Sequence, residues 1–196
     1  MKRVMGGRLM AAVVVLLVLG LLGTGGITRA QGGPQIPPQS RPATPPAVGT
    51  IPKKIDIAKA AVDAQVEQAL IVKGVMQDPS GPWVVAWYKE TAKLGQVGNV
   101  VLAGHVDYWN VGPSVFYRVD QLQKGDEIDV TGADGKVYKY QVQWNKLIEV
   151  KNAPLQQLVG PTTNQSLTLI TCGGTFDYST GEYLQRRIVR ATRIDA

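Results

Sequence analysis

The chain contains one cysteine and one histidine, and each of them ends a run of β-forming residues. Cys172 ends the run SLTLITC and precedes two glycines, whereas His105 ends the run GNVVLAGH. The end of a strand presents a side chain at the surface while the hydrogen-bonded ladder holds the backbone behind it. A thiolate is a nucleophile, and an imidazole that titrates near neutral pH transfers the protons that acyl transfer needs. The pattern therefore indicates cysteine-based acyl transfer.

Arginines near the C-terminus offer the third group that such chemistry needs. A thiol ionises more easily beside a cation, and the oxyanion of an acyl-transfer intermediate needs hydrogen-bond donors. The last β-rich segment, RRIVRATRI, supplies four arginines. Strict alternation along a strand places Arg186 and Arg190 on one face. Arg187 and Arg193 then lie on the other face, and we expect at least one of the four to point toward Cys172.

Each of these residue types also has a structural interpretation. Free cysteine is among the most buried residue types, and a lone histidine is often a satisfied core or surface group. A zinc site needs three or four ligands, which one cysteine and one histidine do not supply. The acidic residues show neither a paired-carboxylate nor a calcium-loop spacing. We therefore expect no metal and no cofactor.

Segments rich in Val, Ile, Tyr and Trp recur along the chain and predict strands. An Asp-Gly pair within GADGK predicts a hairpin between strands near residues 127–131 and 136–142. Residues 114–123, where Ser114 can cap, and residues 153–160 are helical candidates. We expect a mainly β fold that forms a mostly antiparallel barrel. The further strand candidates are residues 55–66, where a short helix near 58–62 is the alternative, 82–90, 98–106, 126–150, 166–172 and 186–194.

Residues 1–30 have the pattern of a membrane-targeting segment. Three cations within the first eight residues precede an uncharged, apolar run over residues 9–27. A run of about 19 residues is near the length that spans a bilayer, so we expect an uncleaved anchor. The alternative is a signal segment cleaved after Ala30. Because positive charge before the run keeps the N-terminus inside, we predict a single-pass protein of the cell membrane with an extracytoplasmic domain.

Residues 31–52 are dense in proline and glycine and predict an extended linker ahead of one folded domain over residues 53–196. The formal charge of +6 comes from the N-terminal part of the chain, because residues 1–54 hold seven Lys or Arg and no acid. The remaining 14 basic and 15 acidic residues nearly balance. A near-neutral domain lacks the footprint of phosphate binding, so we exclude a nucleic-acid partner.

Three motifs occur in the order that is typical of sortases: AGH at residues 103–105, TLITC at 168–172 and QRRIVRA at 185–191. The chain resembles this family over residues 53–196. The flanking segments GNVVLAGHVDY and GPSVFYRVDQLQKGDEIDV resemble class F sortases most, or the related classes D and E. The resemblance aligns the family's arginine with Arg186, because Ile188 then keeps the Arg-x-Ile spacing. A slip of one residue would select Arg187 instead.

The resemblance implies an eight-stranded β-barrel with one or two short helices and an exported cysteine transpeptidase. Cys172 would attack the Thr-Gly bond of an LPxTG-type sorting signal and form a thioacyl enzyme. His105 would act as acid toward the leaving amine and as base toward the incoming one, and Arg186 would donate hydrogen bonds to the oxyanion. Thr171 would contact the substrate, although β propensity alone also explains a threonine there.

The implied partners are an LPxTG-type surface protein or pilin and an amine nucleophile from a peptidoglycan precursor or a pilin lysine. We expect specificity to lie in loops over residues 145–164 and 175–184. Asp107 and Tyr108, just after the histidine, either steer the imidazole or are ordinary loop residues. Two alternatives stand beside this interpretation. An exported cysteine hydrolase would give the acyl group to water, and a non-catalytic anchored binding domain would hide Cys172 from alkylating reagents.

Overall fold

The computed structural model describes residues 48–152 and 155–196. The predicted anchor over residues 1–30, and the predicted linker up to residue 47, lie outside the described residues and stay predictions. Within the described ranges, no helix has the length and apolarity that crossing a membrane requires.

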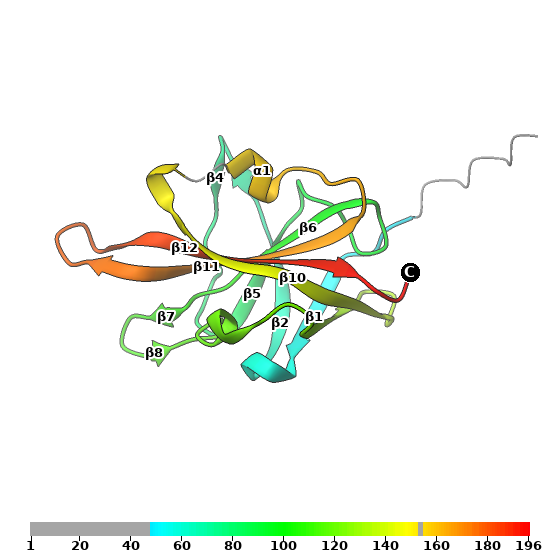
Figure 1. Cartoon of the computed structure of the whole chain (residues 1–196), viewed down its shortest axis with the longest axis horizontal. Coiled ribbons are helices and arrows are strands. Elements are labelled where there is room, and N and C mark those ends of the chain that lie inside the picture. Colours follow the sequence, from blue (N-terminus) through cyan, green and yellow to red (C-terminus); the bar gives the residue numbers. More distant parts are fainter. Residues whose placement is uncertain (1–47, 153–154) are drawn as a thin grey trace, which may run out of the picture. The chain divides into compact units, whose positions relative to one another are not determined.

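Eight strands close into a barrel in the order β1-β2-β5-β6-β11-β12-β10-β9 (Figure 1). This arrangement confirms the mainly β fold and the eight-stranded barrel. Neighbouring strands are antiparallel except in the pairs β2–β5 and β6–β11, which are parallel. The bounds are β1 Pro52–Ile57, β2 Val62–Ala69, β5 Val84–Tyr88, β6 Gly98–Ala103, β9 Glu127–Gly132, β10 Val137–Glu149, β11 Gln165–Asp177 and β12 Glu182–Arg193.

Shorter elements connect these strands. Two small hairpins pair β3 (Ile71–Val72) with β4 (Val75–Met76), and β7 (Asp107–Tyr108) with β8 (Gly112–Pro113). One α-helix occurs in the part of the chain that the structure describes, α1 (Leu155–Val159), within the helical segment predicted at 153–160. The 3-10 turns are η1 (Ala58–Ala60), η2 (Val119–Gln121) and η3 (Val150–Asn152). Residues 55–66, predicted as strand with a short helix near 58–62 as the alternative, therefore contain both: the strands β1 and β2, with the turn η1 between them.

The hairpin predicted from the Asp-Gly pair is confirmed. Thr131 of β9 pairs with Val137 of β10, and Gly135 between them has a φ of +76°. Only glycine adopts this conformation without a steric penalty from a Cβ atom, so the sequence itself determines the turn.

The helix predicted over residues 114–123 is wrong apart from the turn η2. The side-chain amide of Asn145, on β10, donates hydrogen bonds to three carbonyl groups there, at Val119 (2.9 Å), Asp120 (3.1 Å) and Leu122 (2.8 Å). A side chain of a distant strand therefore satisfies these carbonyls in place of a continuing helix, although the Val119 carbonyl also accepts from the N–H of Leu122 at 3.3 Å within the turn. Tertiary contacts override the local helical pattern.

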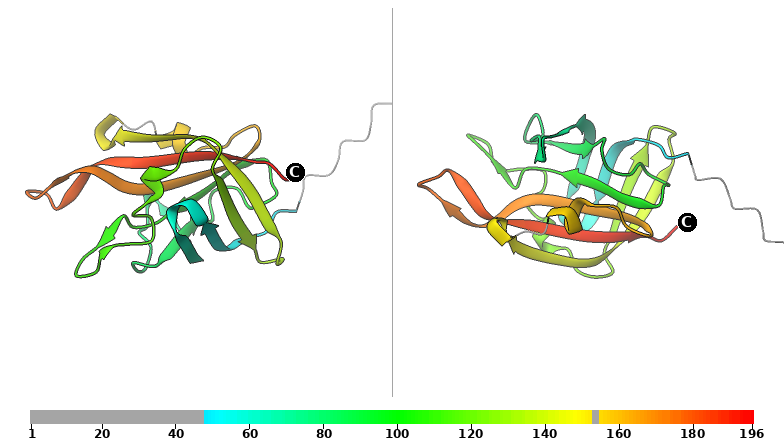
Figure 2. Two further views of the ribbon diagram at one scale, coloured as in Figure 1. Left: turned by 60° about the horizontal axis from the view of Figure 1, so that its bottom comes forward. Right: turned by 90° about the horizontal axis from the view of Figure 1, so that it is seen from above.

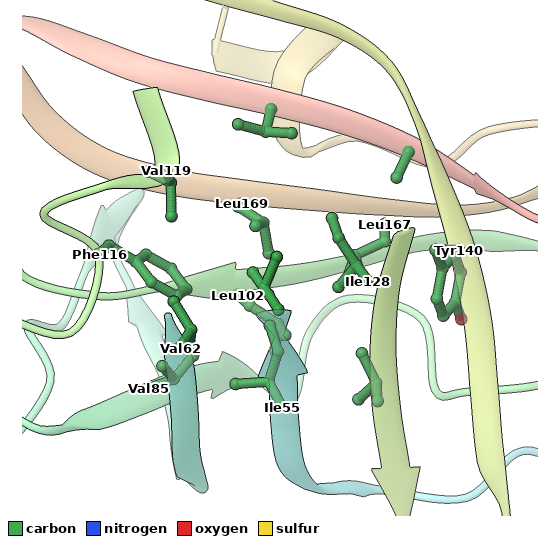
Figure 3. Close-up of a cluster of buried hydrophobic side chains, with 14 of the residues drawn as sticks. Ile55, Val62, Val85, Leu102, Phe116, Val119, Ile128, Tyr140, Leu167 and Leu169 are labelled. Carbon is green, nitrogen blue, oxygen red and sulfur yellow. The ribbon is translucent and has the colours of Figure 1, made fainter. Parts of the chain in front are cut away.

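Side chains that alternate along the strands fill the barrel (Figure 3). Leu167 and Leu169 of β11 pack inside against residues such as Leu102 of β6, and all three are buried. Because successive side chains of a strand point to opposite faces, Ile170 and then Cys172 belong to the outer face. A smaller buried cluster covers part of this outer face and comprises Ala69, Ala86, Tyr88, Val101 and Ala103.

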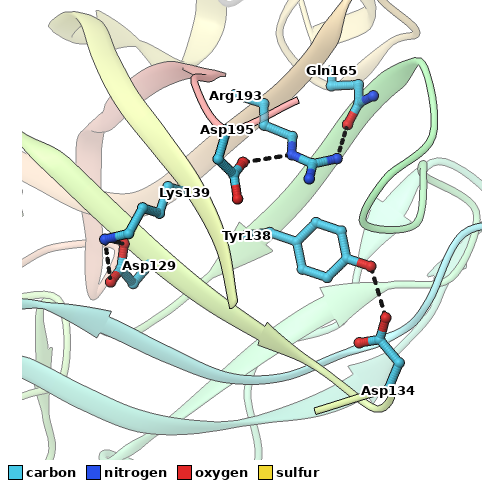
Figure 4. A network of polar contacts seen from close by, with 7 residues as sticks. All are labelled: Asp129, Asp134, Tyr138, Lys139, Gln165, Arg193 and Asp195. Carbon is cyan, nitrogen blue, oxygen red and sulfur yellow. Dashed lines mark hydrogen bonds and ion pairs between the residues drawn. The ribbon is translucent and has the colours of Figure 1, made fainter. Parts of the chain in front are cut away.

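A network of polar contacts fixes the C-terminal end of β12 (Figure 4). Arg193 donates a hydrogen bond from Nε to Asp195 at 2.7 Å and from Nη1 to Gln165 at 2.8 Å. Its guanidinium also lies 4.7 Å from the ring centroid of Tyr138, whose hydroxyl donates to Asp134 at 2.9 Å. Arg193 therefore has a structural role, since it holds the C-terminal end of β12 against its neighbours.

The strands β11 and β12 continue past the barrel as a two-stranded hairpin (Figure 2). Phe176 pairs with Tyr183 in this extension, and their ring centroids are 5.1 Å apart. The loop predicted over residues 175–184 is therefore mostly strand, with a turn at 178–181. The loop predicted over residues 145–164 likewise begins with the last residues of β10.

Candidate active site

The barrel brings together three candidate site residues: Cys172 lies on β11, Arg186 lies on β12, and His105 lies two residues after the end of β6. In the parallel pair β6–β11, Ala103 is the partner of Ile170. His105 follows two residues after Ala103, beyond the end of β6, and Cys172 follows two residues after Ile170 on β11. On the other side of β11, the antiparallel register pairs Cys172 directly with Arg186 of β12.

These three side chains line one cavity of about 170 Å³, together with Thr171. We call it the active-site cavity. Its wall also includes Ala103 and Ile170 of the barrel, and residues that follow β4. The full lining is Met76, Asp78, Pro79, Tyr88, Ala103, Gly104, His105, Ile170, Thr171, Cys172 and Arg186.

His105 has one aromatic neighbour and one contact through a ring nitrogen. Its Nε2 lies 3.2 Å from the carbonyl oxygen of Pro79. Because a carbonyl only accepts hydrogen bonds, Nε2 carries the proton in this contact, and in the neutral ring Nδ1 holds the lone pair. Tyr108 packs edge-on against the imidazole, with 5.1 Å between ring centroids and an interplanar angle of 73°. Tyr108 therefore contacts the histidine ring, as its predicted role of steering the imidazole requires.

Cys172 is half-buried and forms no disulfide. Burial raises the pKa of its thiol, and this outweighs the nearby charge of Arg186, which lowers it. The carboxylates of Asp78 and Asp107 raise the pKa further. Among the described contacts, no hydrogen bond joins the sulfur to His105 or to Arg186. The thiol at rest is therefore protonated at neutral pH, and its activation requires proton transfer.

Arg186 is oriented by the backbone of its own strand. Its Nη1 donates to the carbonyl oxygens of Tyr183 at 2.9 Å and Gln185 at 3.1 Å. Arg187 lies opposite Thr171 in the register and lines a different cavity. Of the two adjacent arginines, the structure brings only Arg186 into the cavity with the histidine and the cysteine.

Arg190 shares the face of Arg186 but serves another purpose. Its Nη2 donates to the carbonyl oxygen of Leu158 at 2.8 Å, and its guanidinium carbon lies 5.8 Å from the ring of Trp144. Asn99 donates to the same carbonyl oxygen of Leu158 at 2.9 Å. These contacts tie the segment that carries α1 to the outer face of the barrel.

The family model described as a sortase domain matches residues 55–194. The chain belongs to the sortase family. No curated protein sequence matches this sortase.

Solved sortase structures share the fold. Sortase A from Corynebacterium diphtheriae, a lid mutant, is 21% identical with a TM-score of 0.56, over 76% of this chain and 73% of that one. A Clostridium perfringens sortase D5 transpeptidase is 23% identical with a TM-score of 0.54, over 74% and 79%. Sortase C-1 from Actinomyces oris is 21% identical with a TM-score of 0.57, over 74% and 72%. These structures belong to classes A, D and C and show the fold alone, so assignment to class F, D or E stays a prediction.

Thr171 carries an unpaired hydroxyl at the edge of the sortase site. Its side chain is on the opposite face of β11 from that of Cys172, and the residue is 3% exposed. Its Oγ1 is buried and has no hydrogen-bond partner among the residues that the structure describes. A buried hydroxyl without a partner costs about 1–3 kcal/mol.

Tyr183 is a site residue that the sequence did not reveal. Its hydroxyl donates a hydrogen bond to a carboxylate oxygen of Asp107, which joins the β11–β12 extension to β7. Burial and this hydrogen bond raise the pKa of Tyr183 to about 12. Tyr183 therefore remains a hydrogen-bond donor at every physiological pH. Nothing in the local sequence around a tyrosine on a late strand predicts a contact with a residue 76 positions earlier.

Proposed function

We propose that this sortase is a cysteine transpeptidase that cleaves the Thr-Gly bond of an LPxTG-type sorting signal and transfers the acyl part to an envelope amine. The observation that carries the proposal is that His105, just after β6, lines the active-site cavity together with Cys172 and Arg186, which are cross-strand partners on β11 and β12. These are the side chains that thiol-based acyl transfer needs.

In the first half of the proposed reaction, Cys172 transfers its thiol proton to His105 and its sulfur attacks the carbonyl carbon of the signal's threonine. A C–S bond forms, and the carbonyl π electrons move to oxygen. The tetrahedral intermediate then collapses, the C–N bond to glycine breaks, and His105 gives its proton to the leaving amine. Because burial keeps the resting thiol protonated, this transfer to the imidazole is required before or during the attack.

Arg186 stabilises the oxyanion in this proposal. Its guanidinium is protonated at every physiological pH and has five N–H donors. Two contacts through Nη1 fix its position, whereas Nη2 and Nε make no hydrogen bond within the described ranges. These donors are available to the developing negative charge, and fixed donors cost no reorganisation during the reaction.

In the second half, a neutral amine attacks the thioester carbonyl carbon. A C–N bond forms, the nitrogen gives its extra proton to His105, and the C–S bond breaks with its electron pair on sulfur. The imidazolium then returns the proton to the thiolate, so the enzyme regains its starting state. Thr171 contributes its unpaired hydroxyl to the bound signal, and the apolar side chains of Ala103 and Ile170 suit the leucine and proline of that signal.

We also propose that residues 1–30 anchor the protein in the cell membrane and that residues 31–52 hold the sortase domain, residues 53–196, on the extracytoplasmic side. The cationic start and the apolar run of the sequence support this topology. The proposed partners are an LPxTG-type surface protein or pilin and an amine from a peptidoglycan precursor or a pilin lysine. Cell fractionation with detection of the N-terminus tests the anchor, and a soluble product that starts after Ala30 would contradict it.

Product analysis tests the reaction. The purified full-length protein and its Cys172→Ala variant are incubated with quenched LPxTG-type peptides and triglycine, and both products are identified by mass. An amine-linked product that the variant fails to form supports the transpeptidase. Hydrolysis alone would favour the cysteine hydrolase, which uses the same residues. If no variant of the signal is cleaved, the result would favour the structural interpretation, in which Cys172 is a buried residue without a catalytic role.

A further inference from the structure

The carbonyl group that contacts the histidine ring belongs to a peptide bond whose N–H is held by an acidic side chain. His105 donates from Nε2 to the carbonyl oxygen of Pro79 at 3.2 Å. The N–H of the same peptide bond belongs to Ser80, and it donates to Oε1 of Glu67 at 2.6 Å. Because a peptide bond is a planar, conjugated unit, a single rigid group lies between the carboxylate and the imidazole.

Glu67 uses both of its carboxylate oxygens for this one neighbour. Its Oε2 accepts the hydroxyl hydrogen of Ser80 at 2.7 Å, while Oε1 accepts the backbone N–H. The side chain is half-buried and belongs to β2. Within residues 48–152 and 155–196, Glu67 takes part in none of the ion pairs. The polar contacts described for this carboxylate therefore all go to Ser80.

Further contacts hold the segment that carries Pro79 against the barrel. The N–H of Gln77 donates to the carbonyl oxygen of Leu70 at 3.0 Å, and the N–H of Leu70 donates to Oε1 of Gln77 at 3.1 Å. The hydroxyl of Tyr88, a buried residue of β5, donates to the carbonyl oxygen of Gln77 at 2.7 Å. These contacts fix the start of the segment, and Glu67 fixes the peptide bond that faces the histidine.

The backbone of the histidine is fixed by separate contacts. The N–H of Gly104 donates to the carbonyl oxygen of Ile170 at 3.1 Å, and the carbonyl oxygen of His105 accepts from the N–H of Phe116 at 2.9 Å. With the backbone held, the direction of the ring depends on rotation about its side-chain bonds. Of the two contacts described for the ring, the tyrosine packs edge-on and the carbonyl of Pro79 binds a nitrogen. The carbonyl contact is therefore the one that selects a tautomer.

We propose that Glu67 is a positioning residue for the acyl-transfer reaction and that it acts on His105 through the peptide bond that follows Pro79. A hydrogen bond accepted from the N–H of this peptide bond increases the negative charge on its carbonyl oxygen, because linked hydrogen bonds polarise one another. The carbonyl then keeps the proton on Nε2 and leaves the lone pair on Nδ1. The buried aspartate of a Ser-His-Asp triad has the same task, through a direct contact with the ring. This inference rests on the proposed transpeptidase function.

The proposal gives each ring nitrogen one task. Nδ1 takes the thiol proton of Cys172 as the C–S bond forms, and it gives that proton to the leaving amine as the C–N bond breaks. Nε2 keeps its own proton and its contact with the carbonyl oxygen throughout. While the ring is an imidazolium, this contact is charge-assisted and therefore stronger. Glu67 neither gains nor loses a proton in any step.

Magnetic resonance of the ring nitrogens tests the tautomer directly, because the chain contains one histidine. The full-length protein is labelled with the heavy nitrogen isotope in histidine alone, and the chemical shifts of both ring nitrogens are recorded on the neutral ring. We expect one tautomer, with the proton on Nε2. In Glu67→Ala, the shifts should move toward those of free imidazole, which exchanges between tautomers. Asp63→Ala, at an acid on the same face of β2 that pairs with Lys54, should leave the shifts unchanged.

Steady-state kinetics of the same variants separate positioning from folding. Glu67→Ala should lower kcat for cleavage of the sorting-signal peptide about tenfold and change KM by less than about twofold, because the lost contact acts on the chemical step. Glu67→Gln keeps an oxygen that accepts from the N–H of Ser80 and should recover part of the loss. Ser80→Ala keeps this N–H and should lower kcat less than Glu67→Ala. Asp63→Ala should match the wild type.

Thermal melts show which variants are folded. If Glu67→Ala does not fold, Glu67→Gln is measured in its place and should change the chemical shifts and kcat in the same direction by a smaller amount. A variant with wild-type chemical shifts and a lower melting temperature would show that Glu67 serves stability alone, and this result overturns the positioning role.

The outcomes separate this inference from the function on which it rests. A wild-type ring that carries its proton on Nδ1 overturns the positioning role, even if the protein cleaves the sorting-signal peptide. The same holds if Asp63→Ala and Glu67→Ala change the chemical shifts and kcat equally. A protein that cleaves no sorting-signal peptide overturns the proposed function and the positioning role with it, whatever the tautomer of His105.

Discussion

Cys172 and Arg186 are direct cross-strand partners in β11 and β12, so their side chains leave the same face of the sheet. Arg187 is instead the partner of Thr171 on the other face. The two adjacent arginines therefore belong to two different cavities, although they are equivalent in residue type. In the proposed mechanism the oxyanion role therefore belongs to Arg186 and not to Arg187.

Replacement of Arg186 should disable the chemical step while sparing the fold. We expect Arg186→Ala to lower kcat/KM for peptide cleavage about 100-fold or more, because the variant loses an oxyanion donor. Arg186→Lys should recover little, since an ammonium does not reproduce the guanidinium fork. Steady-state kinetics and a thermal melt measure both effects, with Arg118→Ala as the surface control. Near-normal turnover by Arg186→Ala would remove this arginine from the mechanism.

The reactivity of the thiol toward iodoacetamide should rise with pH beyond the ordinary cysteine range. Burial raises the pKa of Cys172, so the thiolate fraction at pH 7 is small and the alkylation rate should increase through an inflection above the usual value of about 8.5. Arg186 lowers this pKa and Asp78 raises it. Arg186→Gln should therefore move the inflection up and Asp78→Asn should move it down.

The two variants are expected to shift the inflection pH in opposite directions. A general change in the accessibility of the thiol would not produce that result. If both variants shift the inflection in the same direction, the electrostatic account of the thiol is wrong. Complete protection of the native thiol would instead favour the non-catalytic alternative, in which the cysteine is part of the packing.

Thr171→Val separates a binding role from a structural one. The substitution replaces a buried, unpaired hydroxyl with a methyl group of similar size, so the free energy of unfolding should stay the same or rise by about 1 kcal/mol. The kcat/KM for the signal peptide should fall by about tenfold because the bound signal loses a partner. Thr171→Ser keeps the hydroxyl and should keep activity. Equal activity of Thr171→Val and wild type would leave β propensity as the sole explanation.

Leu169→Ala tests the barrel core beneath the strand that carries Cys172. Leu169 is 1% exposed and lies on β11 three residues before Cys172. We expect the free energy of unfolding in urea to drop by about 2–5 kcal/mol, from lost burial and the cavity left behind. Leu184→Ala, at a residue 44% exposed, should change it by less than about 0.5 kcal/mol. Similar losses for the two variants would contradict the assignment of the core.

Much of the fold and part of the site can be predicted from the sequence because the determinants are local. The Asp-Gly turn fixes the β9–β10 hairpin, and alternation along β11 fixes which side chains face inward. The sequence predicts the unique cysteine and the unique histidine at strand ends; His105 does lie just after β6, but the prediction is wrong for Cys172, because β11 continues to Asp177. Their adjacency, however, follows from the parallel pairing of β6 with β11, which no local pattern reveals.

The remaining features depend on contacts between distant parts of the chain. The hydrogen bonds from Asn145 to the carbonyls of η2 replace the helix expected there. The extension of β11 and β12 beyond the barrel depends on the pairing of Phe176 with Tyr183, in a stretch that contains an irregularity after Gly173.

The most direct test of the account is the intact mass of the full-length protein after a short incubation with an LPxTG-type peptide in the absence of an amine. We predict an adduct equal to the signal up to its threonine, attached to Cys172, absent from Cys172→Ala and released by hydroxylamine as expected for a thioester. An adduct that persists in Cys172→Ala, or cleavage without any adduct on the wild-type cysteine, would contradict the proposed mechanism.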